Sequence, residues 1–201
     1  MVYNGYAHSF AGMGIQWVLF TAIELGVGIL LERQKGLWKR LRSAPLSRFT
    51  LLAGKAAGGT AIALLCLAAT FGFALIFLGV RVHGSVAGFV ALCVASSLMA
   101  AAFGLMIAAL GKTVAATRGL SVLAVLLLTM LGGGWVPAFL FPAWMQKLTL
   151  AIPTRWAVDG LDGVTWRGLG LGDAVMPVAV LLLFTVLFGA VALWKFRWEE
   201  E

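Results

Sequence analysis

Five long apolar runs dominate the chain of 201 residues. Each is close to or longer than the ~20 residues that an α-helix needs to cross a hydrocarbon core of about 30 Å. A helix satisfies its own backbone hydrogen bonds, as the hydrocarbon core demands, and the sequence lacks the short alternating segments typical of a membrane β-barrel. We therefore expect an all-α, polytopic membrane helix bundle with five transmembrane helices. The predicted spans are Ala11–Leu31, Phe49–Val80, Val86–Leu110, Gly119–Val136 and Ala174–Trp194.

The composition excludes several other classes of protein. Hydrophobic residues make up 62% and charged residues 11% of the chain, against about 45–50% and about 25% in soluble domains. So few charges could not cover a water-soluble enzyme without leaving large apolar patches exposed. The net charge is +7, but the basic residues stand mostly between the apolar runs, where they act as topology signals. We expect the chain to contact a lipid bilayer and no nucleic acid.

The basic residues also predict which loops face the cytoplasm. If the loop after the first span is inside, eleven of the 15 Lys and Arg residues lie inside, among them Lys112, Arg118 and Lys195. This bias predicts a multi-pass protein of the cell membrane (inner or plasma), with its C-terminus in the cytoplasm and its N-terminus outside. An odd number of spans with an external N-terminus predicts either a missing upstream span, the chain being a truncated six-span protein, or a short tail that crosses by itself.

The stretch 32–48 between the first two spans carries more structure than a topology signal needs. Leu37 and Leu41 recur at helical spacing beside a basic stripe, which predicts a short amphipathic helix at the membrane surface. Pro45 is expected to end this helix, and Ser47 to cap the next span. The stretch is either a basic loop that only sets topology or a rigid docking element for a cytoplasmic partner, which the apolar stripe and the proline favour.

The segment 136–173 before the last span is predicted to be extracytoplasmic. Its prolines exclude one continuous helix, and its aromatic and aliphatic side chains are too apolar for a free loop. We expect short re-entrant or interfacial helices with tryptophans at the headgroup level. The tryptophans form either a plain aromatic belt or an outer lid that closes a substrate path. The gate candidates are Trp135, Pro137, Pro142, Trp144, Pro153 and Trp156.

Glu24 is an ionisable residue inside the first predicted span. It precedes Glu32 by eight residues, which places it about 12 Å inside the core. A charge at that depth is a functional candidate, and Lys55, at a shallower depth on the next span, is a candidate partner. Glu24 would form an ion pair or take a coupling role, or else be protonated or face a polar helix contact. Lys55 would otherwise extend to the interface.

The remaining polar and small residues are predicted to have structural roles. We expect the histidines to be solitary loop residues, two aspartates to lie on an exposed outer loop, and two glycines of the second span to serve close helix packing. No cluster of His, Cys or acidic residues faces one compartment, so we expect no metal site and an integral-membrane enzyme is disfavoured. These residues are His8 and His83, Asp159 and Asp162, and Gly54 and Gly58.

Three stretches in order resemble the type-2 ABC exporter permease family. The first is ERQKGL (32–37) with RSAPLSR (42–48), which is similar to the family's coupling loop. The second is GGGWVP (132–137) with PAWM (142–145), and the third is PTRWA (153–157). The last two are similar to the family's outer segment. The resemblance covers nearly the whole chain and implies a single transmembrane domain over residues 1–201.

The resemblance implies a permease subunit whose stretch 32–48 is a coupling helix docked on a separate ABC ATPase subunit. It also implies a second permease copy or homologue. An elbow helix and a first span would precede the point where this chain starts. The implied docking residues are Glu32, Arg33, Lys35, Gly36, Leu37, Trp38, Arg40, Leu41 and Pro45.

The chain lacks an ATP-binding motif of its own. The sequence Gly111-Lys112-Thr113 is similar to the end of a phosphate-binding loop, but Met106 stands where that loop needs a glycine. ATP and magnesium are therefore expected on the partner subunit, with no cofactor on this chain. The predicted function is ATP-driven export of an apolar or amphipathic substrate such as a drug, lipid or glycolipid. The alternative is a secondary, ion-coupled exporter, which needs more ionisable residues at the midplane.

Overall fold

The computed structural model describes residues 3–37 and 47–195. Four of the docking candidates, Trp38, Arg40, Leu41 and Pro45, lie outside the described residues. The predicted helix over 32–48 is therefore visible only at its two ends.

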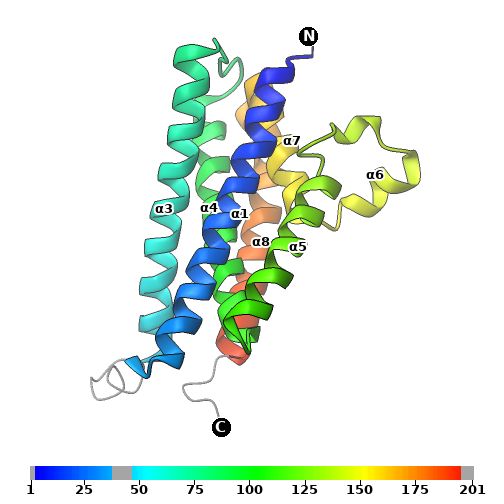
Figure 1. Ribbon diagram of the computed structural model, residues 1–201. Coiled ribbons are helices and arrows are strands. Elements are labelled where there is room, and N and C mark those ends of the chain that lie inside the picture. Colours follow the sequence, from blue (N-terminus) through cyan, green and yellow to red (C-terminus); the bar gives the residue numbers. More distant parts are fainter. Residues whose placement is uncertain (1–2, 38–46, 196–201) are drawn as a thin grey trace.

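The described part of the chain forms helices and no strands, and five of the helices are long and apolar enough to cross a membrane (Figure 1). This confirms the predicted all-α, polytopic bundle. The five are α1 (Gly5–Gln34), α3 (Arg48–Phe77), α4 (Val86–Leu110), α5 (Val114–Leu131) and α8 (Leu171–Lys195). The segment between α5 and α8 holds a 3-10 helix, η1 (Ala138–Leu140), and two short helices, α6 (Ala143–Thr149) and α7 (Pro153–Thr165).

Short polar side chains determine where three of the long helices begin. The side-chain oxygens of Ser47, Ser85 and Thr113 accept backbone N–H groups from the first turns of α3, α4 and α5. Such a cap satisfies a donor that the helix itself leaves unpaired. The predicted capping role of Ser47 is confirmed.

The fourth span is shifted from its prediction: it covers Val114–Leu131 and not Gly119–Val136. Thr113 starts the helix earlier, and Gly133, with a φ of +83°, ends it earlier, because only glycine adopts this left-handed backbone without steric cost. Hydropathy alone carries neither signal. Arg118 therefore lies inside α5. The prediction that it lies in an inner loop is wrong.

The helix α4 is the centre of the bundle and packs against α1, α3 and α8. It lies close to α1, because a Cβ built on Gly26 would lie 2.6 Å from the carbonyl oxygen of Gly104. The predicted packing role of Gly54 and Gly58 is wrong within the described part of the chain, where nothing lies within 4 Å of a Cβ at either position. Gly26 and Gly104 instead allow the backbones of α1 and α4 to pack closely.

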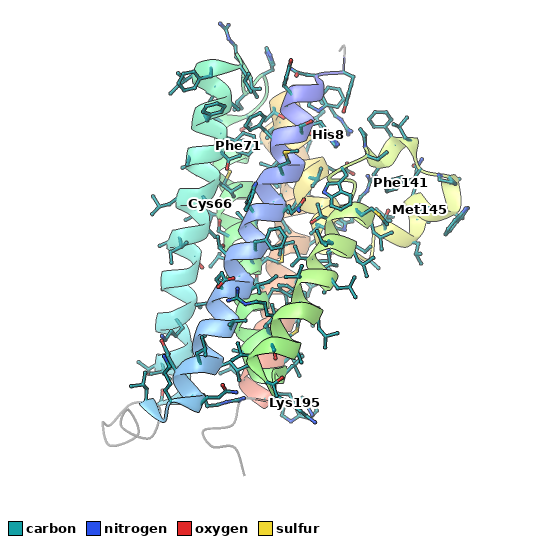
Figure 2. The ribbon with its side chains drawn as sticks, in the orientation of Figure 1. His8, Cys66, Phe71, Phe141, Met145 and Lys195 are labelled. Atoms are coloured by element: carbon teal, nitrogen blue, oxygen red, sulfur yellow. The ribbon has the colours of Figure 1, made fainter. Side chains whose placement is uncertain are left out.

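The bundle has two chemically different ends (Figures 1 and 2). The basic end holds the end of α1, the start of α3, the α4–α5 turn and the end of α8, with Lys35, Lys112 and Lys195. The aromatic end holds the start of α1 and the segment 132–170, from which α6 projects sideways out of the bundle (Figure 1). The segments predicted to share one face of the membrane therefore lie at one end.

Candidate functional site

Two polar contacts brace α1 at the basic end. The Lys55 Nζ of α3 donates to Glu32 Oε1 of α1 at 2.6 Å. The Arg33 Nη2 donates to the backbone carbonyl of Gly111 at 2.9 Å, which joins α1 to the α4–α5 turn. These contacts lie within three residues of the point where the chain leaves α1. A force on the segment 35–47 would therefore act on α1, α3 and α5 together.

The described docking candidates form the start of that segment. Glu32 and Arg33 belong to the last turn of α1, and Lys35 follows as its C-cap. Gly36 has a φ of +71°, which redirects the chain in a way that favours glycine. Leu37 is exposed, as an apolar contact for a partner would need to be. These positions fit a docking element but do not test it.

The structure does not pair Glu24 with Lys55, so the proposed partnership between them is wrong. Glu24 Oε2 instead accepts from Arg118 Nη2 of α5 at 2.8 Å. Lys55 is held by Glu32. The prediction failed because Arg118 had been placed in a loop, while the earlier start of α5 brings it to the level of Glu24.

The Glu24–Arg118 pair lies on an open face of α1, between α3 and α5. The side chains are 62% and 50% exposed in the single chain. Met13 and Trp17, at helical spacing from Glu24, are exposed on the same face. An ion pair at hydrocarbon depth is costly against lipid tails. This face of α1 is therefore the one that most needs water or another protein beside it.

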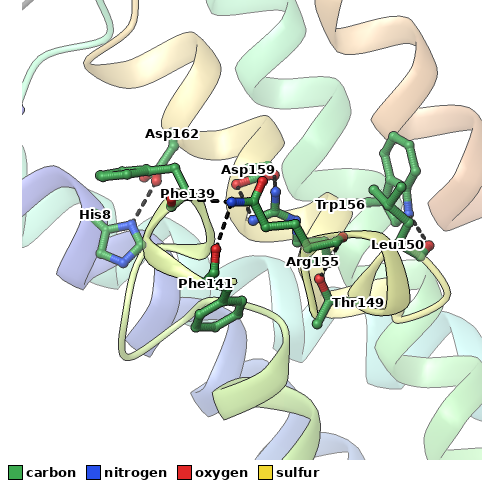
Figure 3. A network of polar contacts seen from close by, with 10 residues as sticks. His8, Phe139, Phe141, Thr149, Leu150, Arg155, Trp156, Asp159 and Asp162 are labelled. Atoms are coloured by element: carbon green, nitrogen blue, oxygen red, sulfur yellow. Dashed lines mark hydrogen bonds and ion pairs between the residues drawn. The ribbon is translucent and has the colours of Figure 1, made fainter. Parts of the chain in front are cut away.

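A buried polar contact joins the start of α1 to α7 at the aromatic end (Figure 3). His8 Nδ1 and Asp162 Oδ2 are 2.7 Å apart, and the residues are only 3% and 1% exposed. The prediction of His8 as a solitary loop residue is wrong, since it lies on the second turn of α1. The prediction of Asp162 on an exposed loop is also wrong, since it faces the interior from α7. His83 does lie in a loop.

Asp159, one turn before Asp162, forms an ion pair within α7. Its Oδ2 is 2.9 Å from Arg155 Nη2, four residues earlier on the helix. Burial raises the pKa of the Asp159 carboxyl above its ordinary value, and the Arg155 charge lowers it in part. Asp159 is therefore partly enclosed and not on an exposed loop as predicted.

The prolines of the outer segment each stand at a helix start. Pro137 and Pro142 directly precede η1 and α6, and Pro153 is the first residue of α7. A proline fits there because the missing N–H would be unpaired in any case. The prediction of short helices between α5 and α8 is confirmed. Whether they enter the membrane stays a prediction.

The gate candidates are not brought together into one cluster. Trp135 Nε1 donates to Gln16 Oε1 of α1 at 2.7 Å, and Trp156 Nε1 donates to the Leu150 carbonyl at 2.8 Å. Trp144 is exposed on the projecting α6. Gln146 fixes the start of this arm by donating to the carbonyls of Phe139 and Phe141. Of the three tryptophans among the gate candidates, Trp135 is the one with a hydrogen bond to α1 in the described chain.

The buried pair His8–Asp162 is the feature that sequence reasoning missed. A signal was present, because Asp162 falls in helical register with the buried Val158 and Thr165. The partner could not be found in the same way, since 154 residues separate the two. In the described part of the chain, no group of three or more His, Cys, Asp or Glu residues could hold a metal ion.

Comparison with known proteins gives the same family over most of the chain. Residues 3–166 match the model of the ABC-2 type transporter family. The chain is 28% identical to the linearmycin resistance permease protein LnrN of Bacillus subtilis. The aligned region has 191 residues and covers 93% of this chain. The chain is 28% identical over 185 residues to the inner membrane transport permease YhhJ of Escherichia coli, covering 89% of this chain. The chain spans about half the length (48%) of these curated relatives.

Proposed function

The chain belongs to the ABC-2 type transporter family, and on this premise we propose that it is a permease subunit of an ATP-driven exporter. It is a multi-pass membrane protein with five candidate spans. ATP hydrolysis would take place on a separate ATPase subunit that docks at the basic end, which then faces the cytoplasm together with the C-terminus. The positive-inside rule supports this orientation. The alternative of an ion-coupled exporter is not favoured by the family.

The bracing of α1 at the basic end is the observation that carries this proposal. An ATPase subunit bound to the segment 32–48 would push on a chain that Glu32 and Arg33 tie to α3 and to the α4–α5 turn. Closure of the ATPase subunits would then move several spans as a unit. The braced spans would then switch between two arrangements, and ATP bound to the partner subunits would decide which one is favoured.

The open face of α1 supports an export path between this chain and a second permease subunit. It combines apolar and aromatic side chains, Met13 and Trp17, with the ion pair Glu24–Arg118. A partner permease across this face would remove the ion pair from lipid. A path with such a wall suits an apolar or amphipathic substrate. The relative named for linearmycin resistance agrees with export of a drug-like compound.

Charge reversal at the brace tests the coupling role. We expect Lys55→Glu and Glu32→Lys each to reduce permease-stimulated ATP hydrolysis about fivefold, because each places like charges together across α1 and α3. The double variant Glu32→Lys with Lys55→Glu should recover most of the loss. The measurement is ATPase activity of the ATPase subunit reconstituted with each permease variant in proteoliposomes.

A control and a separate test of docking accompany this experiment. Arg81→Glu changes a charge in the loop at the other end of the bundle and should leave stimulation unchanged. Leu37→Glu should instead weaken retention of the ATPase subunit in a pull-down, since Leu37 is an exposed apolar contact. Full stimulation by both single reversals, or equal loss in the double variant, would contradict coupling through the brace.

A further inference from the structure

A cleft of about 400 Å³ lies between α4 and α5, next to the turn that joins them, and plays no part in the proposed path. Its walls are almost entirely apolar, with Phe103, Met106 and Ile107 on α4 and Leu120 and Ala124 on α5. We call it the α4–α5 cleft. A volume of this size takes a small molecule or part of a lipid.

Two hydroxyl groups break the apolar lining. Thr117 and Ser121, one turn apart on α5, line the cleft and are only 8% and 7% exposed. Other helical threonines, such as Thr129 and Thr185, donate their hydroxyl to the carbonyl of the preceding turn. Thr117 and Ser121 make no side-chain hydrogen bond to any described residue. Both hydroxyls line the cleft, so they are free to donate to an acceptor that enters it.

A positive charge stands at the mouth of the same cleft. Lys112, in the α4–α5 turn, lines the cleft, is exposed, and has no ion-pair partner in the described chain. The N-terminal end of α5 begins two residues later and adds a partial positive charge. Counted from the start of α5 at Val114, Thr117 and Ser121 lie about 5 Å and about 11 Å along the helix.

The order of these groups matches one kind of ligand. A cation at the mouth, two hydroxyl donors one to three turns deeper and an apolar floor are complementary to an anionic head, ester carbonyls and an acyl chain. The cleft lies at the basic end, close to the Arg33–Gly111 contact. Basic pockets between membrane helices on the cytoplasmic side are typical binding places for anionic lipid headgroups.

We propose that the α4–α5 cleft binds an anionic phospholipid, with its phosphate at Lys112, its ester carbonyls at Thr117 and Ser121, and one acyl chain against Phe103 and Leu120. Only the choice of the cytoplasmic leaflet depends on the proposed function. The bound lipid would fill the gap between α4 and α5 beside the brace of α1.

Photolabelling tests this site. The full chain is reconstituted into phosphatidylcholine vesicles that contain a small fraction of phosphatidylglycerol with a diazirine in one acyl chain, and labelled peptides are identified by mass spectrometry. We expect labelling to concentrate in residues 103–124 and to be competed by unlabelled phosphatidylglycerol but not by added phosphatidylcholine. Lys112→Gln and the double variant Thr117→Val with Ser121→Ala should each reduce it about fivefold.

Matched controls separate the site from the general lipid shell. Lys147→Gln at the aromatic end and Thr129→Val, whose hydroxyl is already bonded within α5, should leave labelling unchanged. Ala124→Trp, which fills the apolar floor, should abolish it in a chain that still elutes as a folded species.

Three outcomes would overturn the proposal. These are labelling spread evenly over the spans, labelling unaffected by the cleft variants, or competition by inorganic phosphate as strong as by phosphatidylglycerol, which would indicate a site for a soluble anion. The assay contains no ATPase subunit. Its failure would therefore leave the export proposal standing, and failure of the export tests would leave this site standing.

Discussion

At the residue scale, backbone contact decides which glycines matter. Gly26 of α1 and Gly104 of α4 allow the two helices to approach until a Cβ on Gly26 would lie 2.6 Å from the Gly104 carbonyl oxygen and 2.9 Å from the Ile107 Cβ. Such an atom would overlap its neighbours, and both neighbours belong to the packed centre of the bundle. By contrast, no described atom lies within 4 Å of a Cβ built on Gly28 of the same helix.

We therefore expect Gly26→Ala to lower the free energy of unfolding by about 1–3 kcal/mol, the usual effect of overpacking. For a chain of this size each kcal/mol corresponds to a Tm decrease of roughly 2–4 °C. The measurement is thermal unfolding in detergent micelles followed by circular dichroism. Gly28→Ala is the control and should be neutral or slightly stabilising, because alanine favours a helix over glycine. Equal effects of the two variants would refute the contact.

The raised pKa of Asp159 has a consequence for pH dependence. Burial raises this pKa in the folded state above the ordinary value of 3.8, although Arg155 opposes the shift. The folded state then holds a proton that the unfolded state has lost, so the contribution to stability is complete below 3.8 and is lost as the pH rises through the folded-state pKa. Asp159→Asn removes the titrating carboxyl and with it this pH-dependent contribution to stability.

The expected result is that the Tm of the parent protein, relative to that of Asp159→Asn, decreases as the pH is raised from about 4 to about 7. Thermal unfolding of both proteins across this range measures the difference. Asp173→Asn, at an exposed position in the first turn of α8, serves as the reference and should follow the parent. A difference that grows in the opposite direction would mean that the Arg155 pair outweighs burial.

At the scale of elements, the buried contact between His8 and Asp162 connects α1 to α7. It ties the start of the first described helix to the segment that precedes α8, and α7 itself packs against α8. The remaining buried atoms of the pair, His8 Nε2 and Asp162 Oδ1, have no further hydrogen-bond partner in the described chain. Within the described chain this one contact is therefore the hydrogen bond that the two buried side chains share, beside the apolar packing of α1 on α7.

We expect His8→Phe to destabilise the protein by about 1–3 kcal/mol, because the Asp162 carboxylate is left buried without a partner. Adding Asp162→Leu should restore part of the loss, since removal of both polar groups is less costly than removal of one. Unfolding in micelles is again the measurement. His83→Phe, at the exposed loop histidine, should have little effect, and a loss equal to that of His8→Phe would argue against the buried pair.

At the scale of the whole molecule, sidedness follows from the separation of the two ends. The basic end carries Lys35 and Lys112, and the aromatic end carries Arg81 and Lys147. Since every long helix connects these ends (Figure 1), all loops at one end must share one side of the membrane.

Cysteine labelling in intact cells tests which side each end faces. In a background with Cys66 and Cys93 replaced by alanine, Arg81→Cys and Lys147→Cys should react with a membrane-impermeant maleimide before lysis. Lys35→Cys and Lys112→Cys should react only after lysis, because the positive-inside rule places the basic end in the cytoplasm. Labelling of the basic end in intact cells would contradict the proposed orientation and, with it, docking of an ATPase subunit at that end.

Much of the fold was predictable because membrane spans and helix caps are local properties of the chain. The third span agrees with its prediction, Val86–Leu110, and Ser47 caps the next helix as expected. The fourth span was misplaced because hydropathy has no term for a capping threonine or a left-handed glycine. The part of the coupling segment outside the described residues stays a prediction.

The sequence by itself determined that this chain is a helical membrane bundle with five candidate spans and a basic end, since apolar length, proline and charge act on neighbouring residues. The tertiary structure alone decided the polar partners: Glu24 with Arg118, Lys55 with Glu32, and His8 with Asp162. It also decided that two hydroxyls face a cleft. These outcomes depend on which helix faces meet, and helices of similar hydropathy do not encode their neighbours in any local pattern.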